Sequence, residues 1–350
     1  MNTTRTSIRR WLFWLAVVGF AWFLLSRLGD LRHLAATLAG GHWPWLLLAA
    51  ASQVGYFVFF AWMFQVAFST VGVKGRVVQL VPVVLAAVFA NTLAPSGGTA
   101  GLALYADDAV RRGQSGAQAT AGALLATVID FFAFAVVLLA GMGHLLAHNA
   151  LHAYEVAAAA LMTLVSAAQV GALVLALGHP TSLRRGLAFL QRTITTICRR
   201  LRRPSPVHAN WADVVTAQLA NAAGMFKNHP GRIAYAFFIG VASNAVSLGT
   251  LYFLFRAFDQ PPTLGVLVSG YAMAILFLNV SPVPQGLGVV EGLMTLVLAT
   301  LGIPNSPALA ITLAFRGISL WIPILLGFLL LRFVPSFSPK TRKETPEPPN

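Results

Sequence analysis

The amino-acid sequence predicts an all-α polytopic membrane protein with about six full transmembrane helices and two inverted re-entrant helical hairpins. Composition and two interrupted apolar stretches predict this fold. Hydrophobic residues make up 57% of the 350 residues and charged residues only 10%, whereas a soluble domain carries roughly 25% charged residues. The apolar stretches around 91–101 and 279–292 are each broken at their centres by proline and glycine.

The two breaks carry functional information because a membrane helix cannot be interrupted cheaply. Backbone groups freed from a helix find no water in the hydrocarbon, so irregular backbone persists there only inside protein or beside a cavity. The prolines and glycines of the breaks are Pro95, Gly97, Gly98, Pro282, Pro284, Gly286 and Gly288. Two such interruptions in corresponding halves of a chain indicate a substrate site near the bilayer midplane.

Full spans are predicted from apolar length, since crossing the hydrocarbon takes about 20 mostly apolar residues. The predicted spans are 11–28, 44–70, 118–146, 153–178, 232–258 and 307–333. The shorter apolar runs beside the breaks pair into hairpins over about 77–112 and 263–303. The first stretch resembles a signal peptide, but no small-residue cleavage site follows it, so we expect an uncleaved helix.

The distribution of positive charge orients these segments. With residues 1–10 in the cytoplasm, only Arg27, Arg32 and Arg256 of the 24 Lys and Arg fall outside, and Arg316 falls within a span. This agrees with the excess of Lys and Arg in cytoplasmic loops. The first hairpin then enters from the cytoplasm and the second from outside. One transmembrane domain is predicted over 11–334, followed by a disordered cytoplasmic tail over 335–350.

A basic loop over about 179–231 interrupts the cytoplasmic side. Apolar residues from Leu183 to Leu201 recur at helical spacing. The arginines around this stripe are Arg184, Arg185, Arg192, Arg199, Arg200, Arg202 and Arg203. Such a helix is expected to contact anionic lipid on the inner leaflet. An ordinary positive-inside loop packed on the protein is the alternative. A second short amphipathic helix is predicted from Trp211 to about Phe226.

Three ionisable residues fall inside predicted membrane segments, where such residues are rare and functional by default. Asp130 lies near the middle of its span, Glu291 directly follows the second break, and Arg316 lies near the middle of the last span. We expect Glu291 and Arg316 to lie close together. They either bind the transported group or only fix helix packing. Asp130 either joins the site or bonds to a nearby polar group.

Polar residues and helix starts at the breaks complete the predicted substrate site. Small residues four apart, Gly97 with Gly101 and Gly288 with Gly292, predict that two half-helices pack closely at the centre. Helices starting near Gly98 and Gly288 could hold an anionic headgroup at their N-termini. Neutral hydrogen bonds are expected from Asn91, Ser96, Thr99, Asn279, Ser281 and Gln285, with Gly286 in the turn. Satisfying the broken backbone is the other role open to these residues.

The sequence predicts no catalytic centre, metal site or cofactor. It contains none of the common phosphate-binding, hydrolase or zinc motifs. His144, His148 and His152 are expected to be solvated loop residues rather than metal ligands, and Cys198 an inert thiol. Asp107 and Asp108, beside Arg111 and Arg112, are predicted to form a solvated charge cluster. The net charge of +14 follows from the cytoplasmic loops and does not indicate nucleic acid.

The segment from Asn279 to Arg332 resembles the transmembrane domain of the lysylphosphatidylglycerol synthases and their stand-alone, flippase-like relatives. The residues carrying the resemblance are Pro282–Gly292, Leu301–Pro304, Phe315–Gly317, Trp321 and Pro323; upstream, Leu93–Gly98 and Arg111–Gly113 are similar to the family's first motif. The likeness covers roughly 11–333. Two stretches depart from the family pattern. Residues 99–105 carry no charge, and Val128 and Ile129 stand where many members have an arginine. The chain ends about 17 residues after its last predicted span and looks like the membrane half without a synthase domain.

The resemblance implies a lipid translocator of the bacterial inner membrane that moves a phospholipid or lipid-linked headgroup between leaflets. Its expected partners are anionic or aminoacylated phospholipids and a separate lipid-modifying synthase, with a homodimer as one option for assembly. Two other functions remain open, a secondary transporter of a small solute or ion and a non-catalytic scaffold for a lipid-modifying enzyme. Enzymatic activity is not expected.

Overall fold

The computed structural model describes residues 38–93, 99–147, 178–200, 228–281 and 284–330, together with short stretches within 171–176 and 212–224. The part described is all helical and contains no strand. Its elements are α3 (Trp43–Thr70), α4 (Val77–Leu93), α5 (Thr99–Arg111), α6 (Gly116–Ala147), α8 (Pro180–Arg200), α10 (Pro230–Ala257), α11 (Leu264–Val280), α12 (Val289–Thr300), α13 (Asn305–Arg316) and α14 (Ile322–Leu330). The predicted span 11–28, most of 153–178 and the C-terminal tail lie outside the described residues.

Four helical segments are long and apolar enough to cross a membrane: α3, α6, α10 and the stretch Asn305–Gly327. The bounds of α3, α6 and α10 differ from the predicted spans by two residues at most, and Asn305–Gly327 ends six residues before the predicted span 307–333. Large apolar side chains such as Leu47, Leu139 and Phe238 are exposed on their outer faces. A soluble monomer rarely exposes so much apolar surface, and a lipid-facing surface accounts for it.

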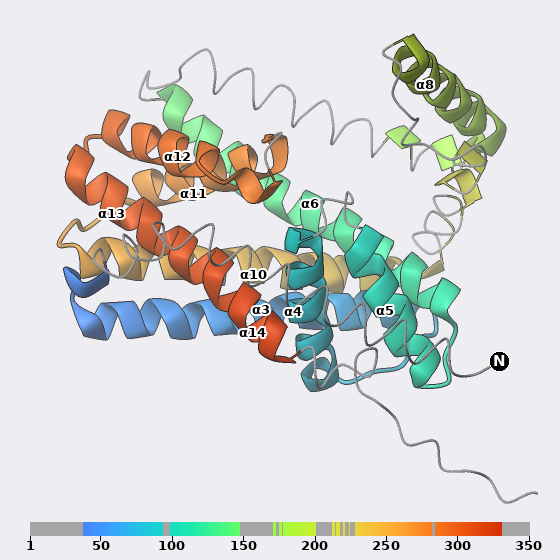
Figure 1. Cartoon of the computed structure of the whole chain (residues 1–350), viewed down its shortest axis with the longest axis horizontal. Coiled ribbons are helices and arrows are strands. Elements are labelled where there is room, and N and C mark those ends of the chain that lie inside the picture. Colours follow the sequence, from blue (N-terminus) through green and yellow to red (C-terminus); the bar gives the residue numbers. More distant parts are fainter. Residues whose placement is uncertain are drawn as a thin grey trace, which may run out of the picture.

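Helices α3 and α10 lie side by side in the bundle and run in opposite directions (Figure 1). The Ser52 hydroxyl donates to the Val246 carbonyl across this contact at 2.8 Å. At one end of the pair, Arg232 donates to the Ser69 carbonyl. We call this the Arg112 end, after a residue described below. At the other, the His42 end, the His42 amide donates to the Ala257 carbonyl at 2.9 Å.

Helices α4 and α5 form the first predicted hairpin. Arg112, just after α5, donates to the Gln79 side chain near the start of α4 at 3.0 Å. Near the tip, the Gly101 amide donates to the Asn91 side chain at 2.8 Å. The two helices are therefore antiparallel neighbours, and their open end lies at the Arg112 end. Both are steeply inclined to α3 (Figure 1).

Helices α11 and α12 form the second hairpin, which opens at the His42 end. Gly270 near the start of α11 lies against Leu298 near the end of α12, and Gly286 at the tip lies against Leu278. Gly265 contacts the ring of His144 at the end of α6. The bases of the two hairpins are thus joined to opposite ends of the molecule.

The two hairpins are connected through the last span. A Cβ atom on Gly327 of α14 would lie 2.5 Å from the Leu85 carbonyl oxygen of α4, so only glycine permits this approach. Leu287, at the tip of the second hairpin, packs against the apolar cluster that contains the buried face of α4. The tip therefore lies against the core formed around the first hairpin.

Candidate functional site

A buried ion pair joins the tip of the second hairpin to the last span. The Arg316 Nε donates to the Glu291 Oε1 at 2.9 Å, and Nη2 donates to the Gln285 carbonyl at 2.5 Å. The two charged side chains are only 7% and 19% exposed. Sequence reasoning predicted that Glu291 and Arg316 would be close, and this is confirmed. The contact with the Gln285 backbone was not predicted.

The turn before α12 has a left-handed backbone that presents its carbonyl to Arg316. Gln285, Gly286 and Gly288 have φ angles of 56°, 62° and 81°. Positive φ comes at little cost for glycine but strains a residue such as glutamine. The two glycines therefore explain how the chain can reverse within a few residues, while Gln285 is held in place by the bond to its carbonyl.

The N-terminus of α12 is already hydrogen-bonded to a carboxylate of its own first turn. Glu291, in the first turn, accepts a hydrogen bond from the Gly288 amide at 2.7 Å through Oε2. Its carboxylate thus bonds to both Arg316 and the helix N-terminus, where negative charge is favoured. The prediction of a headgroup-binding N-terminus near Gly288 is revised by this contact, because the Gly288 amide is occupied by the protein's own carboxylate.

Arg316 lies where the last span changes its helical winding. A π-helical segment, Gly317–Trp321, separates α13 from α14. Pro323 follows shortly afterwards; it has no amide hydrogen, and its ring would clash with the carbonyl four residues earlier. Widening the helix just before this proline relieves the clash. Such π segments occur often at functional sites, and here the segment begins directly after the buried arginine.

A cavity of about 100 Å³ adjoins this ion pair. The polar part of its wall comes from α3, α10, α11, α13, the turn before α12 and the π-helical segment. The polar residues that line it are Gln53, Tyr56, Ser247, Tyr271, Gln285, Arg316 and Ser319. The Tyr271 hydroxyl donates to the Asn244 side chain at 2.9 Å, and Thr250 donates to Gln53 at 3.4 Å. The cavity has room for a few water molecules or a small polar group.

Sequence reasoning missed the neutral part of this wall. Gln53 and Ser247 are uncharged polar residues within long, mostly apolar stretches, and both are buried. They carry no charge, so a search for ionisable residues passes over them. Buried polar side chains must be hydrogen-bonded, and an isolated glutamine or asparagine in a predicted span is the signal that could have indicated them.

Asp130 lies on α6 close enough to Tyr56 and Tyr271 to interact with both electrostatically. These two tyrosines line the cavity, so Asp130 belongs to its surroundings without being part of its wall. Its carboxylate makes no side-chain hydrogen bond within the described residues. The predicted alternative, a bond to a neighbouring serine, threonine or backbone group, is not found there.

The predicted polar residues of the breaks mostly satisfy the backbone. Asn91 accepts from the Gly101 amide, and Asn279, which is exposed, donates to the Ile275 carbonyl of its own helix. Ser281 lies at the end of α11, where its amide donates to the Phe277 carbonyl. Ser96, Gly97 and Gly98 lie outside the described residues, as does the side chain of Thr99. Of the predicted residues, Gln285 and Arg316 therefore line the cavity. Glu291 is bonded to Arg316, and Asn279 is not part of the cavity lining.

The prediction that paired glycines pack two half-helices together is wrong for the second hairpin. Cβ atoms added at Gly288 and Gly292 would meet no other atom within 4 Å. Gly101 is crowded, but by Asn91 of its own hairpin. Glycines four apart permit close packing without requiring it. Here Gly288 serves the left-handed turn instead.

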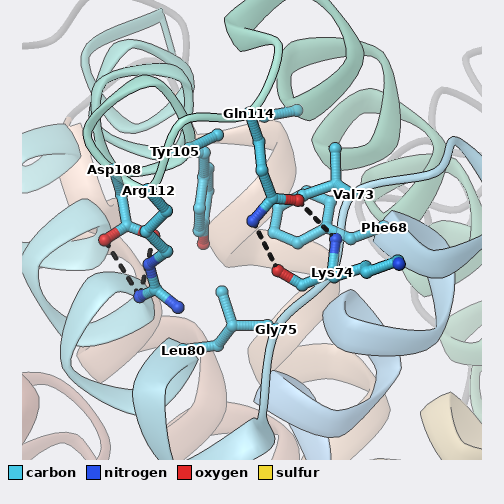
Figure 2. Close-up of a pocket in the computed structure, with 11 residues that line it drawn as sticks. Phe68, Val73, Lys74, Gly75, Leu80, Tyr105, Asp108, Arg112 and Gln114 are labelled. Atoms are coloured by element: carbon cyan, nitrogen blue, oxygen red, sulfur yellow. Dashed lines mark hydrogen bonds and ion pairs between the residues drawn. The ribbon is translucent and has the colours of Figure 1, made fainter.

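A second polar cluster lies at the base of the first hairpin, around a space of about 10 Å³ (Figure 2). The Gln114 side chain accepts from the Lys74 amide at 2.5 Å and donates to the Lys74 carbonyl at 2.7 Å. Arg112 pairs with Asp108 at 2.9 Å. Asp108 is only 5% exposed, so the prediction of a purely solvated charge cluster is wrong for this residue. The cluster fastens the hairpin base to the loop after α3.

The remaining predicted residues show no site in the part of the chain described. Among its residues, no group of three or more His, Cys, Asp or Glu could hold a metal ion. His144 packs against Gly265 at the end of α6, whereas His148 and His152 lie outside the described residues. Cys198 is a free, half-buried thiol on α8.

Comparison with known families identifies the membrane region. The family described as "Lysylphosphatidylglycerol synthase TM region" matches residues 11–327. The chain belongs to this family. Among curated proteins and solved structures, none matches the chain. Membership in the lysylphosphatidylglycerol synthase transmembrane family, together with the long apolar helices, makes the protein a multi-pass membrane protein with a lipid-related function.

Proposed function

We propose that this protein moves a phospholipid or lipid-linked headgroup between the leaflets of the bacterial inner membrane. The observation that carries the proposal is the buried Arg316, which binds the tip of the second hairpin and lines a polar cavity. An ionisable residue deep in a membrane protein marks a substrate pathway by default. Family membership supplies the link to lipids.

The chemistry of the cavity suits a phosphate group. A guanidinium carries five N–H donors and matches the oxygens of phosphate. Arg316 uses Nε and Nη2 in its described bonds, which leaves further donors for a ligand. The neutral wall offers the Gln53 amide and the Tyr271 hydroxyl nearby. A headgroup phosphate would therefore find one cation and several neutral hydrogen-bonding groups in one place.

The same contacts suggest how a headgroup would open the site. A phosphate that binds Arg316 competes with Glu291 and with the Gln285 carbonyl for the same guanidinium. Losing those bonds would release the strained turn at Gln285 and allow the tip of the second hairpin to move. A ligand can shift a conformational equilibrium only through such differential contacts. In this mechanism the two hairpins are re-entrant, and both termini are cytoplasmic.

The protein itself would act as a translocator and not as an enzyme. Lipid modification would then be the task of a separate synthase that supplies the headgroup. Anionic or aminoacylated phospholipids are the proposed substrates, and a homodimer is one possible assembly.

Headgroup movement across proteoliposomes tests the proposal. Purified protein is reconstituted with anionic, zwitterionic or aminoacylated fluorescent lipids, and the fraction that changes leaflet is measured by dithionite quenching. We expect selective movement in the native protein and a loss of at least tenfold in Arg316→Gln. Arg256→Gln is the matched control, because Arg256 lies over the Trp45 ring at the His42 end, away from the cavity wall.

The outcomes of the proteoliposome experiment test the activity and the site separately. Movement no faster than in empty liposomes, from protein that is folded by circular dichroism, contradicts lipid translocation. Movement that persists in Arg316→Gln contradicts the proposed site but retains the activity. Loss in Arg316→Gln that is still folded by circular dichroism, with retention in Arg256→Gln, supports both.

A secondary transporter of a small solute or ion is the second candidate. The observation that favours it is Asp130, a carboxylate on a membrane-spanning helix beside two cavity tyrosines. Proton movement into the same proteoliposomes, followed with a pH-sensitive dye, distinguishes the two. Solute-driven proton uptake that Asp130→Asn abolishes, without lipid movement, would replace the lipid translocator with this function.

A further inference from the structure

Helix α8 stands apart from the membrane bundle, near the end where α5 and the start of α10 lie (Figure 1). Its sequence contains five arginines and no acidic residue. It is connected to α10, one of the long apolar helices, through a loop of about thirty residues. A helix so placed remains near the membrane surface whatever else the protein does.

Short helical pieces at 212–213 and 215–217 lie beside α8 and cover one side of it. Leu183 of α8 and Ala212 opposite it are both buried. The Ala212 amide donates to the Gln191 side chain at 3.2 Å, and Arg184 forms an ion pair with Asp213. These contacts account for the covered side of the helix and for the charge of one arginine.

Beside the covered side, α8 presents a basic and aromatic face. Arg185, Phe189 and Arg192 are four and three residues apart, so they share one side of the helix. Phe189 is 72% exposed and the adjacent Leu190 is 49% exposed. Neither Arg185 nor Arg192 has a hydrogen-bond or ion-pair partner among the residues described. We call Arg185, Phe189 and Arg192 the basic aromatic face.

A groove of about 500 Å³ lies beside this face. Thr181, Arg184, Arg185, Gln191, Arg192 and Asp213 provide its polar lining. Arg185 and Arg192, which have no described partner, thus line the groove together with Asp213. The exposed Phe189 ring lies between these two arginines in the α8 sequence. Phosphate oxygens complement the guanidinium groups, and the phenyl ring needs an apolar environment. A phospholipid surface supplies both, because its phosphates lie at the surface and its acyl chains lie beneath them.

We propose that α8 is an anchor for anionic lipid, in which Phe189 and Leu190 enter the inner leaflet while Arg185 and Arg192 bind lipid phosphates. An amphipathic helix with arginines beside exposed phenylalanine and leucine lies in the interface in this way. The inference needs the cytoplasmic placement of α8 but does not need lipid translocation. It extends to the structure one of the two uses that the sequence left open for this loop.

The experiment uses the full chain in nanodiscs, with one fluorescent label on α8. Cys198, the one cysteine of the chain, is replaced by serine, and Thr193→Cys receives a bimane label. Thr193 is exposed and lies one turn after Phe189. A label there reports on this side of α8 without replacing Arg185, Phe189 or Arg192. Nanodiscs contain phosphatidylcholine with increasing phosphatidylglycerol, and a doxyl-labelled acyl chain quenches bimane that reaches the lipid.

Quenching is expected to increase with the phosphatidylglycerol fraction and to weaken at high salt. Each arginine near an anionic surface contributes roughly fivefold to binding. Arg185→Gln with Arg192→Gln should therefore raise the phosphatidylglycerol content needed for half-maximal quenching at least severalfold. Phe189→Ser should reduce quenching at every composition, and Phe189→Leu should restore it. Each single replacement should produce part of this effect, and Arg184→Gln is the matched control for either one, because it removes one charge from an arginine that is already paired.

Three results would overturn the proposal. Equal quenching in pure phosphatidylcholine would show that anionic lipid is not recognised. Equal weakening by Arg184→Gln and by either Arg185→Gln or Arg192→Gln would show that total charge alone acts. Absence of quenching, with glycerol phosphate instead shifting bimane emission at millimolar concentration, would assign the groove to a soluble phosphate compound. All three readouts are independent of lipid movement, so they stand whether or not the transport assay succeeds.

Discussion

Arg316 has two roles at the scale of single residues, because it neutralises Glu291 and also binds the Gln285 carbonyl. Removing either member of a mostly buried ion pair leaves the other charge uncompensated. Breaking such a pair is strongly destabilising, whereas replacing both charges together can be nearly neutral. The pair thus predicts a non-additive pattern of stabilities, which distinguishes a coupled site from two independent polar residues.

Arg316→Gln alone should lower the free energy of unfolding by about 3–5 kcal/mol. Combining it with Glu291→Gln should recover a large part of that loss, because no uncompensated charge remains. Chemical unfolding of the detergent-solubilised protein, followed by circular dichroism, measures all three variants. Strictly additive losses would mean that the two side chains are not coupled in solution.

Gln285 illustrates how a backbone position can be selected for its carbonyl. Its φ of 56° lies in the left-handed region, where a residue with a side chain is strained by about 1–2 kcal/mol. Because Arg316 bonds to the carbonyl, Gln285→Gly should retain the contact and leave stability within about 1 kcal/mol of the native value. Gln285→Val should destabilise by about 1–3 kcal/mol. Thermal unfolding compares the two, and equal Tm values would contradict the strained turn.

At the scale of elements, the hairpins depend on contacts that single side chains permit. Helix α14 approaches α4 at Gly327, where a Cβ atom would lie 2.5 Å from a carbonyl oxygen and 2.9 Å from the Cβ of Phe89. Backbone cannot move aside as a flexible side chain can. The close approach therefore couples the last span, and with it Arg316, to the first hairpin.

Gly327→Ala should force α4 and α14 apart and destabilise the protein by about 1–3 kcal/mol, as overpacking typically does. Gly143→Ala on α6 is the matched control, because an added Cβ meets no atom within 4 Å there. This control should be neutral or stabilising by up to about 1 kcal/mol, since alanine favours the helix. Similar losses of Tm in both variants would contradict the close approach.

At the scale of the whole molecule, the hairpin bases are joined to opposite ends of the bundle. The first base is joined to the Arg112 end through Gln79, and the second to the His42 end through the contact of Gly265 with His144. Together with the charge asymmetry of the loops, this arrangement predicts that the loop before α6 is cytoplasmic and that the loop before α13 lies outside.

Labelling by a membrane-impermeant maleimide checks that prediction. In a Cys198→Ser background, Asn305→Cys should react in intact spheroplasts, whereas Ser115→Cys should react only after permeabilisation. Both positions are exposed. The native protein, whose one cysteine is Cys198, is labelled separately as a reference, because its cysteine should behave like Ser115→Cys. Reaction of both introduced cysteines from one side would exclude the inverted arrangement.

The sequence alone determined the helices, the breaks and the central ion pair. Apolar length and the backbone limits of proline and glycine act locally, so α3, α6, α10 and the last span could be predicted to within a few residues. Glu291 and Arg316 could also be predicted to meet, since neither charge is stable alone among apolar segments.

Only the tertiary structure decided how those parts are used. The polar cavity is assembled from Gln53, Ser247 and Tyr271 on three different helices, and no local pattern brings them together. Asp108 is buried because neighbouring elements pack over it, whereas the contact of Glu291 with the Gly288 amide is local to the start of α12. Local sequence restricts what a segment can form, whereas burial and partnership depend on packing between distant segments, which a single sequence does not specify.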